Sequence, residues 1–313
     1  MKILLPTTLD LDPRLPEGVT AVRYDPAERL RPEDRDAEAL VVWGHRGEAL
    51  AEAARDLGGL RWVQGLAAGD DALLAAGFAP DVVLTTGVGL HTRPVSEHAL
   101  ALVLALVRRL PAAGRAQAEH RWSRELGGPQ PLHPDGPVTT LLDARVLVWG
   151  FGEIGQALAG YLSALGARVR GVARSAGERA GFDVVDDGAL DDELADTDVL
   201  VMVLPQAPAT ERALDAGRIA ALPDHAYVVN VGRGSTGDEE ALLAALREGR
   251  LAGAALDVTA TEPLPAGSPL WDEPRVLLTP HAAGGRPVGS DALVAENAAA
   301  LVAGLPLRNV VAR

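Results

Sequence analysis

The sequence predicts an α/β protein in which helices cover parallel β-sheets. Short apolar runs alternate with helical segments along most of the 313 residues, and this alternation is typical of parallel sheets covered on both faces. One run, residues 146–149, leads into a G-x-G-x-x-G turn at 150–155, a helical pattern and a second apolar run at 169–172. This order of strand, turn, helix and strand is typical of a dinucleotide-binding unit. Because the chain is long for a single core, we expect two such domains.

Residues 1–90 show the pattern of one sheet. Strands are expected at 3–5, 19–23, 39–43, 61–63 and 82–85, and helices at 48–57 and 71–76. The loop Gly65-Leu66-Ala67-Ala68-Gly69-Asp70 follows the fourth strand and therefore lies at the carboxyl end of the sheet. Its small residues would let backbone N–H groups approach an anion. Taken alone, the loop is explained better by an ordinary connection.

A long apolar helix is expected next. Pro94 begins a helical pattern at 95–109 that is apolar almost all round, which predicts burial between layers or between subunits. Residues 127–140 have proline or glycine at half of their positions and predict an irregular surface connection. His133, within this connection, is expected to be solvated.

The second half of the chain predicts the larger sheet. The acidic stretch 183–198 indicates a solvated helix and loop rather than a metal site, because its carboxylates lack ligand-loop spacing. Further strands are expected at 198–204, 225–231, 252–256 and 276–279, and helices at 238–248 and 287–303. At least six strands would then form a doubly wound sheet.

Composition limits the chemistry and the partners. A net charge of −14 opposes binding to nucleic acid or to an anionic membrane. The apolar segment 98–110 is too short to span a bilayer, and the amino terminus lacks the features of a signal peptide, so a cytoplasmic location is expected. The chain has no cysteine, and Lys2 is its only lysine. These facts exclude thiol chemistry and disfavour a lysine Schiff base, and no metal is expected.

Polar residues follow each of the late strands. Arg233, Asp257, Glu262 and His281 would all lie on the carboxyl edge that holds the glycine turn. Each has an ordinary explanation: a surface cation, a helix cap, a loop charge or a structural histidine. Together they fit hydride transfer to a carbonyl beside a carboxylate. The arginine would orient the carboxylate, the histidine would donate a proton, the glutamate would favour the imidazolium, and the aspartate would accept from a nicotinamide carboxamide.

The end of the second strand of the dinucleotide unit predicts the cofactor. Enzymes that use NAD place an acidic residue there to bind the ribose 2′-hydroxyl. Here the strand ends in Ala173-Arg174-Ser175, and no carboxylate is present. Arg174 can pair with a 2′-phosphate, Ser175 can hydrogen-bond to it, and Arg179 can assist. NADP is therefore favoured, and NAD stays possible if Arg174 is only a surface arginine.

At these residues the sequence resembles the D-isomer-specific 2-hydroxyacid dehydrogenase family. The motifs GLAAGDD, VSEHAL, GFGEIG, NVGRGS, LDVTATEPLP and TPHAAG occur in the order and spacing of the family. The resemblance implies that Arg233 is the catalytic, substrate-orienting arginine and that Glu262 pairs with the catalytic His281. The residues then expected at the cofactor are Gly150, Gly152, Glu153, Ile154, Gly155, Arg174, Ser175, Leu204, Pro205, Val231, Gly232, Arg233, Asp257, His281 and Gly284. Those expected at the substrate are Trp43, Ala67, Ala68, Gly69, Arg233 and His281, with backbone amides around Ala68 and Gly69 holding the substrate carboxylate.

The family's architecture implies two Rossmann-like or flavodoxin-like domains, one inserted into the other. A discontinuous substrate domain would comprise residues 1–93 and 284–313, and the dinucleotide-binding Rossmann domain would comprise 94–283. Hinge motion at the two crossings would close the site. Members are typically homodimers in which the helix after Pro94 and the following loop reach across. Trp122 in that loop would either pack in the interface or touch the partner's site.

The substrate implied is a small 2-keto acid, or the 2-hydroxy acid in reverse. Trp43 would close a strand near the pocket, as tryptophans do in relatives that reduce glyoxylate and hydroxypyruvate, although it could be a core or rim aromatic. Related formate dehydrogenases carry glutamine in place of Glu262, so that activity is disfavoured. The end of the chain at Arg313, without a regulatory domain, weakens but does not exclude phosphoglycerate dehydrogenase. A further alternative is a cofactor-sensing, corepressor-like protein on the same scaffold.

Overall fold

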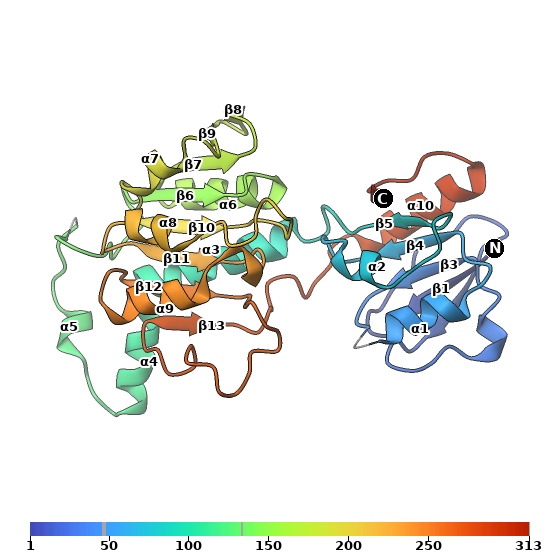
Figure 1. Cartoon of the computed structure of the whole chain (residues 1–313), viewed down its shortest axis with the longest axis horizontal. Helices are drawn as coiled ribbons and strands as arrows, with labels where there is room; N and C mark the ends of the chain where they lie inside the picture. Colours follow the sequence, from blue (N-terminus) through green and yellow to red (C-terminus); the bar gives the residue numbers. More distant parts are fainter. Residues whose placement is uncertain (46–47, 133, 313) are drawn as a thin grey trace. The chain divides into compact units, whose positions relative to one another are not determined.

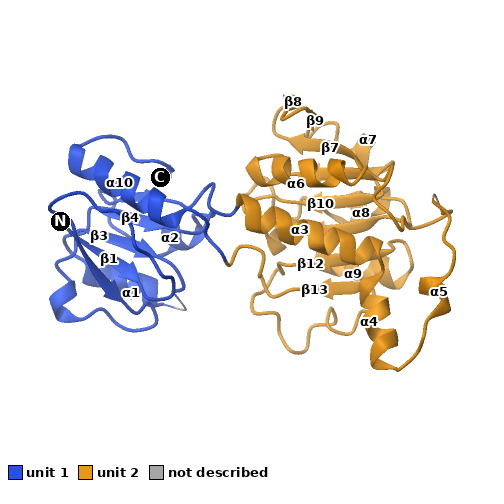
Figure 2. Cartoon of the chain, turned by 180° about the vertical axis from the view of Figure 1, so that it is seen from behind, with its two compact units in different colours: residues 1–91, 286–313 blue, residues 92–285 orange. Residues whose placement is uncertain are grey.

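The chain forms two compact units in this computed structural model, which describes all residues except 46–47, 133 and 313. One unit comprises Met1–His91 and Arg286–Arg313, and the other comprises Thr92–Gly285 (Figure 2). We call them unit 1 and unit 2. The expected domains, 1–93 with 284–313 and 94–283, have boundaries two residues away from these. Which unit binds substrate and which binds cofactor stays a prediction.

Unit 1 is built on a five-stranded parallel sheet. The strands, in the spatial order β2-β1-β3-β4-β5, are β1 (Lys2–Pro6), β2 (Thr20–Tyr24), β3 (Ala39–Val42), β4 (Trp62–Gly65) and β5 (Val83–Thr85) (Figure 1). The order reverses between β1 and β3, which is where such sheets bind ligands at their carboxyl edge. Helices α1 (Ala49–Asp56) and α2 (Asp71–Ala75) pack on one face, and α10 (Ser290–Ala303) packs on the other.

The carboxyl-terminal segment is part of the core of unit 1. Asn297, on α10, donates a 2.7 Å hydrogen bond to Gln64 Oε1, and its own oxygen accepts from the Arg308 backbone at 2.8 Å. Gln64 is fully buried on β4. This buried hydrogen bond forms only when α10 packs on the sheet, so residues far apart in the sequence fold as one unit.

Unit 2 is built on an eight-stranded sheet with the spatial order β13-β12-β11-β10-β6-β7-β9-β8. Its strands are β6 (Arg145–Trp149), β7 (Arg168–Ala173), β8 (Gly177–Arg179), β9 (Phe182–Asp186), β10 (Val199–Met202), β11 (Tyr227–Asn230), β12 (Gly253–Leu256) and β13 (Val276–Leu278). All are parallel except β8, which pairs antiparallel with β9. The order reverses between β6 and β10, so this doubly wound sheet has its switch point directly after the glycine turn.

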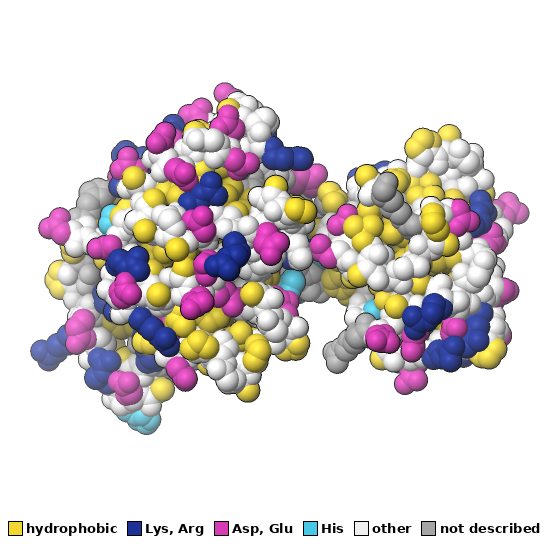
Figure 3. Space-filling view, viewed as in Figure 1, with side chains coloured by type: hydrophobic (Ala, Val, Ile, Leu, Met, Phe, Trp, Pro, Cys, Tyr) yellow, Lys and Arg dark blue, Asp and Glu magenta, His cyan; other side chains and the backbone are white. Residues whose placement is uncertain are grey.

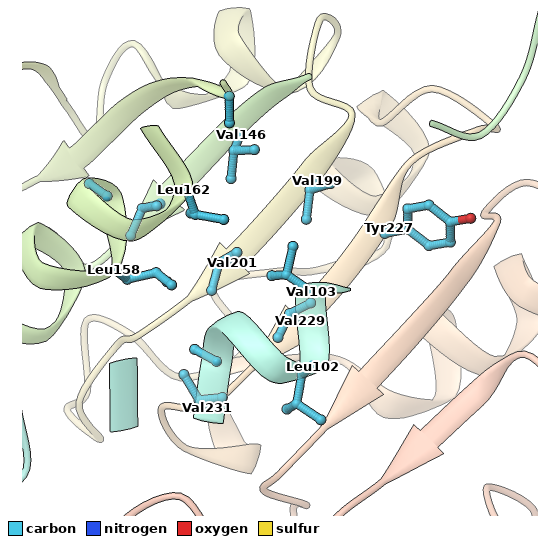
Figure 4. Close-up of a cluster of buried hydrophobic side chains, with 14 of the residues drawn as sticks. Leu102, Val103, Val146, Leu158, Leu162, Val199, Val201, Tyr227, Val229 and Val231 are labelled. Carbon is cyan, nitrogen blue, oxygen red and sulfur yellow. The ribbon is translucent and has the colours of Figure 1, made fainter. Parts of the chain in front are cut away.

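Helices cover both faces of the larger sheet. Val146 and Val148 of β6 point into a core shared with α3 (Thr92–Val107) and α6 (Glu153–Ala164), as Figure 4 shows in part. Leu147 and Trp149 alternate to the other face. There they meet a second core that is covered by α7 (Leu190–Leu194), α8 (Ala216–Ala221) and α9 (Glu239–Arg247). Burial on both faces explains why these strands are apolar throughout.

The acidic stretch was the main error in the predicted elements. Residues 183–198 were expected to form a helix and loop, but β9 occupies Phe182–Asp186 before the short helix α7. In β9, Phe182 and Val184 pack on the core while Asp183 between them is exposed, which is the period of a strand. The acidic composition obscured that short alternation. The prediction also lacked β8, and the sheet has eight strands rather than the minimum of six.

Other element boundaries differ by smaller amounts. The expected strand 39–43 ends at Val42, so Trp43 lies just beyond it. The last helix begins at Ser290 rather than at residue 287, because Gly289 before it has a left-handed φ of 87°. Three helices were not predicted: α4 (Leu110–Ala118), α5 (Arg124–Gly127) and α8. In residues 128–140 the described positions are irregular, as expected, and His133 lies outside the described residues.

The surface carries both signs of charge. Figure 3 shows acidic and basic side chains interspersed over the visible face of each unit, without a broad basic patch there. Many of the arginines are paired with carboxylates, for example Arg29 with Asp56 at 3.0 Å and Arg168 with Asp143 at 2.9 Å. Within the described part of the chain, no helix is long and apolar enough to cross a membrane.

Candidate active site

The glycine turn after β6 has the geometry of a phosphate cradle. Gly150 has a φ of 104°, and a Cβ there would lie 2.5 Å from the Val203 carbonyl oxygen. A Cβ on Gly155 would lie 2.5 Å from the Gly150 oxygen, so this glycine allows α6 to pack closely on β6. Gly152 has open space beside its Cα. The three glycines therefore provide the tight turn, the close helix packing and the open approach that a pyrophosphate requires.

The start of α6 supplies the donors of this cradle. Gly152 is the N-cap of the helix, and no side chain caps it. The first N–H groups and the positive end of the helix dipole therefore suit a bound anion. Glu153 accepts a 3.1 Å hydrogen bond from Thr92. Ile154 packs against the α3 side of the core.

Leu204 and Pro205 lie beside this turn, at the switch point of the sheet. They follow β10 and Val203, and the Val203 N–H donates a 2.7 Å hydrogen bond to the Trp149 carbonyl. Gly232, after β11, approaches them closely, since a Cβ on it would lie 2.5 Å from the Leu204 oxygen. These residues fit a dinucleotide that lies across the carboxyl edge.

The end of β7 carries cations and a hydroxyl instead of an acid. Arg174 and Ser175 are exposed directly after this strand. Arg179, on β8, donates to Ser175 Oγ at 2.7 Å and to the Ser175 carbonyl at 2.9 Å. It also lies 3.5 Å from the Phe151 carbonyl, within the glycine turn. The β8–β9 hairpin thus holds a second guanidinium beside this end of the cradle.

Arg233 is held through its backbone. Asn230, at the end of β11, donates to the Arg233 carbonyl at 3.1 Å and accepts from Gly232 N–H at 3.0 Å. The Thr236 hydroxyl donates to the same carbonyl at 2.6 Å. Arg233 follows Val231 and Gly232 in the chain, and its half-buried guanidinium donates to the Gly232 carbonyl at 2.8 Å. Asn230 was missed as a supporting residue, although an asparagine directly after a buried strand was a detectable signal.

His281 and Glu262 form a direct pair. His281 Nδ1 lies 2.7 Å from Glu262 Oε2, and the other carboxylate oxygen accepts from the Thr259 N–H at 3.1 Å. Because a carboxylate only accepts, Nδ1 carries the proton, and Nε2 is the nitrogen that can serve a substrate. Both side chains are half-exposed, at the same carboxyl edge as Arg233. The peptide between Glu262 and Pro263 is cis.

Asp257 holds the loop that carries His281. Its carboxylate accepts from the Thr279 hydroxyl at 2.6 Å, from Ala282 N–H at 2.8 Å and from Ala283 N–H at 3.0 Å. Its side chain is fully buried, and the loop continues to Gly284. Its expected role as acceptor for a nicotinamide carboxamide stays a prediction. Thr279 is a second supporting residue that the sequence did not single out.

The residues expected at the substrate carboxylate and rim lie in unit 1. Trp43 follows β3 and stacks on His91, with ring centroids 5.7 Å apart. The loop with Ala67, Ala68 and Gly69 follows β4, and Ala67 accepts a 2.7 Å hydrogen bond from Gly87 N–H. Trp43 and the loop thus lie on the carboxyl edge of their own sheet, as predicted.

Other features of unit 2 lie away from this edge. A cavity of about 540 Å³ opens at the amino ends of the strands, beside Arg145, Arg168 and His225, and contains none of the motif residues. Trp122, between α4 and α5, is 91% exposed. Among the described residues, no three His, Asp or Glu side chains are arranged to hold a metal ion.

Comparison with known proteins gives consistent matches. A family model described as D-isomer specific 2-hydroxyacid dehydrogenase, NAD binding domain, matches residues 100–283. The chain is 34% identical over 299 residues to glyoxylate/hydroxypyruvate reductase A of Serratia proteamaculans (strain 568), covering 89% of this chain and 87% of that protein. It is 34% identical over 217 residues to D-3-phosphoglycerate dehydrogenase of Mycobacterium bovis, covering 68% of this chain and 38% of that protein.

A solved structure extends the likeness to both units. The crystal structure of NADPH-dependent glyoxylate/hydroxypyruvate reductase from Sinorhizobium meliloti, in complex with NADP and sulfate, has a TM-score of 0.81 and 29% identity. The match covers 99% of this chain and 97% of that one. The glycine cradle and the paired histidine therefore belong to a scaffold shared over its whole length. This chain is a member of the D-isomer specific 2-hydroxyacid dehydrogenase family, and it is an NAD(P)-dependent oxidoreductase.

Proposed function

We propose that this chain reduces a small 2-keto acid of the glyoxylate or hydroxypyruvate type, with NADPH as the favoured reductant. The observation that carries the proposal is the 2.7 Å pair between His281 and Glu262 at the carboxyl edge of the cofactor-type sheet. A histidine held in one tautomer by a carboxylate can pass a proton to an alkoxide as that charge develops. The reductase relative and the NADP-bound structural neighbour support the same substrate class.

The roles of the residues follow from their chemistry. Arg233 binds the carboxylate of the keto acid and polarises the neighbouring carbonyl, because a guanidinium makes two parallel hydrogen bonds. His281 donates the proton from Nε2 to the carbonyl oxygen, and Glu262 stabilises the imidazolium and fixes its orientation. The bound reduced nicotinamide supplies the hydride. The glycine cradle, Leu204, Pro205 and Gly232 hold the dinucleotide, together with Asp257 and with Gly284 in the loop that Asp257 holds.

The proposal also assigns substrate-binding residues to unit 1. Backbone N–H groups around Ala68 and Gly69 bind the substrate carboxylate, and Trp43 limits the size of the group beyond the keto carbon. Stacking on His91 supports a fixed tryptophan ring. A bulky 2-keto acid should therefore be a poorer substrate than glyoxylate.

The preference for NADP rests on the end of β7. Ala173-Arg174-Ser175 at this strand end contains no carboxylate that would repel a 2′-phosphate, and Arg179 contacts Ser175 from β8. The test is kcat/KM with NADPH and with NADH, measured for the wild type and for Arg174→Ala. We expect NADPH to be preferred and the variant to lose most of that preference. Equal values for the two cofactors in the wild type would refute this part of the proposal.

Phosphoglycerate dehydrogenase activity is the second candidate, favoured by the mycobacterial relative. A panel of 2-keto acids with both reduced cofactors, and of 3-phosphoglycerate with both oxidised ones, separates the two. Turnover fastest on glyoxylate or hydroxypyruvate supports the reductase. Negligible turnover on every acid, together with tight cofactor binding and a protein partner, would instead support a cofactor-sensing protein.

We extend the proposal to a homodimer in the cytoplasm. Large apolar side chains at Leu110 and Trp122 are exposed on and after α4, which supports an association surface there. Sedimentation of the wild type and of Trp122→Ser measures the assembly. A wild type that sediments as a monomer would contradict the dimer.

A further inference from the structure

A second histidine of unit 2 reaches the loop that carries His281. His98 lies on α3, and its Nε2 is 3.1 Å from Thr279 Oγ1 and 3.2 Å from Asp257 Oδ1. The His98 side chain is 23% exposed and the Asp257 side chain is 0% exposed. An element from the start of unit 2 thus contacts two residues near its end, through a side chain that the proposed reaction does not use.

The donors and acceptors of this contact determine the tautomer of His98. The Thr279 hydroxyl gives its proton to Asp257 Oδ1 at 2.6 Å, so its oxygen is left to accept. The carboxylate can only accept. Both neighbours of His98 Nε2 are therefore acceptors, and this nitrogen must carry a proton that it shares between them.

The loop beyond Thr279 needs such support. His281 has a φ of 50°, which lies in the left-handed region that non-glycine residues rarely adopt. Its N–H donates to the Asp257 carbonyl at 2.7 Å, and the next two N–H groups donate to the Asp257 carboxylate. The backbone of Asp257 and both of its carboxylate oxygens therefore hold the loop, and His98 Nε2 contacts one of these oxygens, Oδ1.

We propose that His98 is a positioning residue for His281, acting through Asp257 and Thr279. The inference rests on the proposed function, because it takes His281 as the proton donor. His98 does not touch the reacting atoms in this scheme. It keeps the carboxylate and the Thr279 hydroxyl in one arrangement, so that the strained loop presents the imidazole in one orientation toward the substrate.

The first test compares three substitutions of His98. Phenylalanine keeps a ring without a donor, and asparagine is too short to reach Asp257. Glutamine can place an amide N–H where Nε2 stands. With glyoxylate and NADPH, we expect H98F and H98N to lower kcat by about 10- to 100-fold, with a much smaller change in the KM for glyoxylate. H98Q should recover most of the lost turnover. H98F and H98N both remove the contact, so the test still works if one of these two variants does not fold.

The chain offers a matched control. His225 Nε2 lies 3.0 Å from Asp198 Oδ1 at the opposite edge of the same sheet, with side-chain exposures of 30% and 11%. H225F removes the same kind of contact at similar burial. This contact lies at the amino ends of the strands, away from the loop that carries His281. H225F should leave kcat unchanged. If H225F lowers kcat as much as H98F does, the effect is a general loss of fold integrity and the inference is overturned.

A measurement without turnover separates this inference from the proposed function. Hydrogen exchange of the amides of residues 281–283, which donate to Asp257, should be about tenfold faster in H98F and H98N. It should be unchanged in H98Q and H225F. Faster exchange with an unchanged kcat would show a structural contact only and would overturn the positioning role. If the wild type turns over no 2-keto acid, the proposed function fails, whereas unchanged exchange in H98F and H98N overturns the contact itself.

Discussion

At the scale of single residues, the pair His281–Glu262 is the most informative contact in the molecule. The carboxylate occupies Nδ1 at 2.7 Å and is itself fixed by the Thr259 N–H. Nδ1 of His281 thereby binds the glutamate, which orients the ring, and Nε2 is left available to a substrate. The shared sheet edge and the family resemblance predicted the pair, but neither could say which nitrogen the glutamate would contact.

His281→Ala should lower kcat by about 10²- to 10⁴-fold, which is the usual contribution of a positioned proton donor. The dissociation constant of NADPH, measured by fluorescence titration, should change little. Glu262→Gln keeps a hydrogen-bond acceptor but removes the charge that favours the imidazolium, so its kcat should lie between those of the wild type and His281→Ala. A wild-type kcat in His281→Ala would exclude it as the proton donor.

His45 makes the free energy of unfolding depend on pH. Burial lowers the pKa of His45 from 6.5 to about 4, beside the buried Tyr24. Between these values the unfolded chain binds a proton that the folded chain does not, so stability falls as the pH drops from 6.5 to about 4. The resulting loss in the free energy of unfolding should be about 3 kcal/mol. Urea unfolding of the wild type and His45→Phe at pH 7 and pH 4 measures it; an equal pH dependence in both proteins would contradict the assignment.

At the scale of elements, the β8–β9 hairpin shows where sequence reasoning failed. Acidic residues hid the alternation of β9, and β8 has only three residues. Yet this hairpin places Arg179 against Ser175 and the glycine turn. A short edge strand is stabilised by its neighbour rather than by its own sequence, so its pattern is weak. The proposed cofactor preference thus depends partly on an element that the sequence did not reveal.

The cap of α9 gives a prediction at this scale. Asp238 accepts a 3.1 Å hydrogen bond from Ala241 N–H at the start of the helix and also pairs with Arg212. Asp238→Ala should lower the free energy of unfolding by about 1 kcal/mol, and Asp238→Asn, which can still cap the helix, should cost less. Denaturant titration of the three proteins gives both values.

Because Asp238 is ionisable, its contribution to the free energy of unfolding depends on pH. The hydrogen bond from Ala241, and then the pairing with Arg212, lower the pKa of this carboxyl below its ordinary value of 3.8. The stabilisation is therefore present above that value and is lost as the pH falls through the lower, folded-state pKa. The stability difference between the wild type and Asp238→Asn should shrink in acid. A difference that grows in acid would contradict this sign.

At the scale of the whole molecule, the two units have separate cores. Unit 2 is one continuous stretch, Thr92–Gly285, whereas unit 1 needs the carboxyl-terminal segment for Asn297 to reach Gln64. A fragment of residues 92–285 should therefore unfold cooperatively and bind NADPH on its own. A fragment of residues 1–91 should not fold alone, because the face of its sheet under α10 would be exposed. Circular dichroism melting and cofactor titration test both, and an unfolded 92–285 fragment would show that the units depend on each other.

The sequence alone determined much of this protein. Apolar runs of strand length, separated by helical segments, are local patterns, so they predicted two parallel sheets and most of their strands. The glycine spacing predicted the cradle after β6, since its three glycines lie within six consecutive residues, although the close approach at Gly150 is to Val203. Because parallel strands share one carboxyl edge, the residues after β11, β12 and β13 were also expected together, and the sheet order confirms this.

Only the tertiary structure decided how side chains from distant segments meet. No local pattern linked His98 to Asp257 or Asn297 to Gln64, although each pair lies within hydrogen-bond reach. Such contacts depend on crossing positions of helices and strands, which are set by packing over the whole core rather than by neighbouring residues. The sequence thus specified the groups proposed to react and the edge that carries them. The fold determined the tautomer, the support and the orientation of those groups.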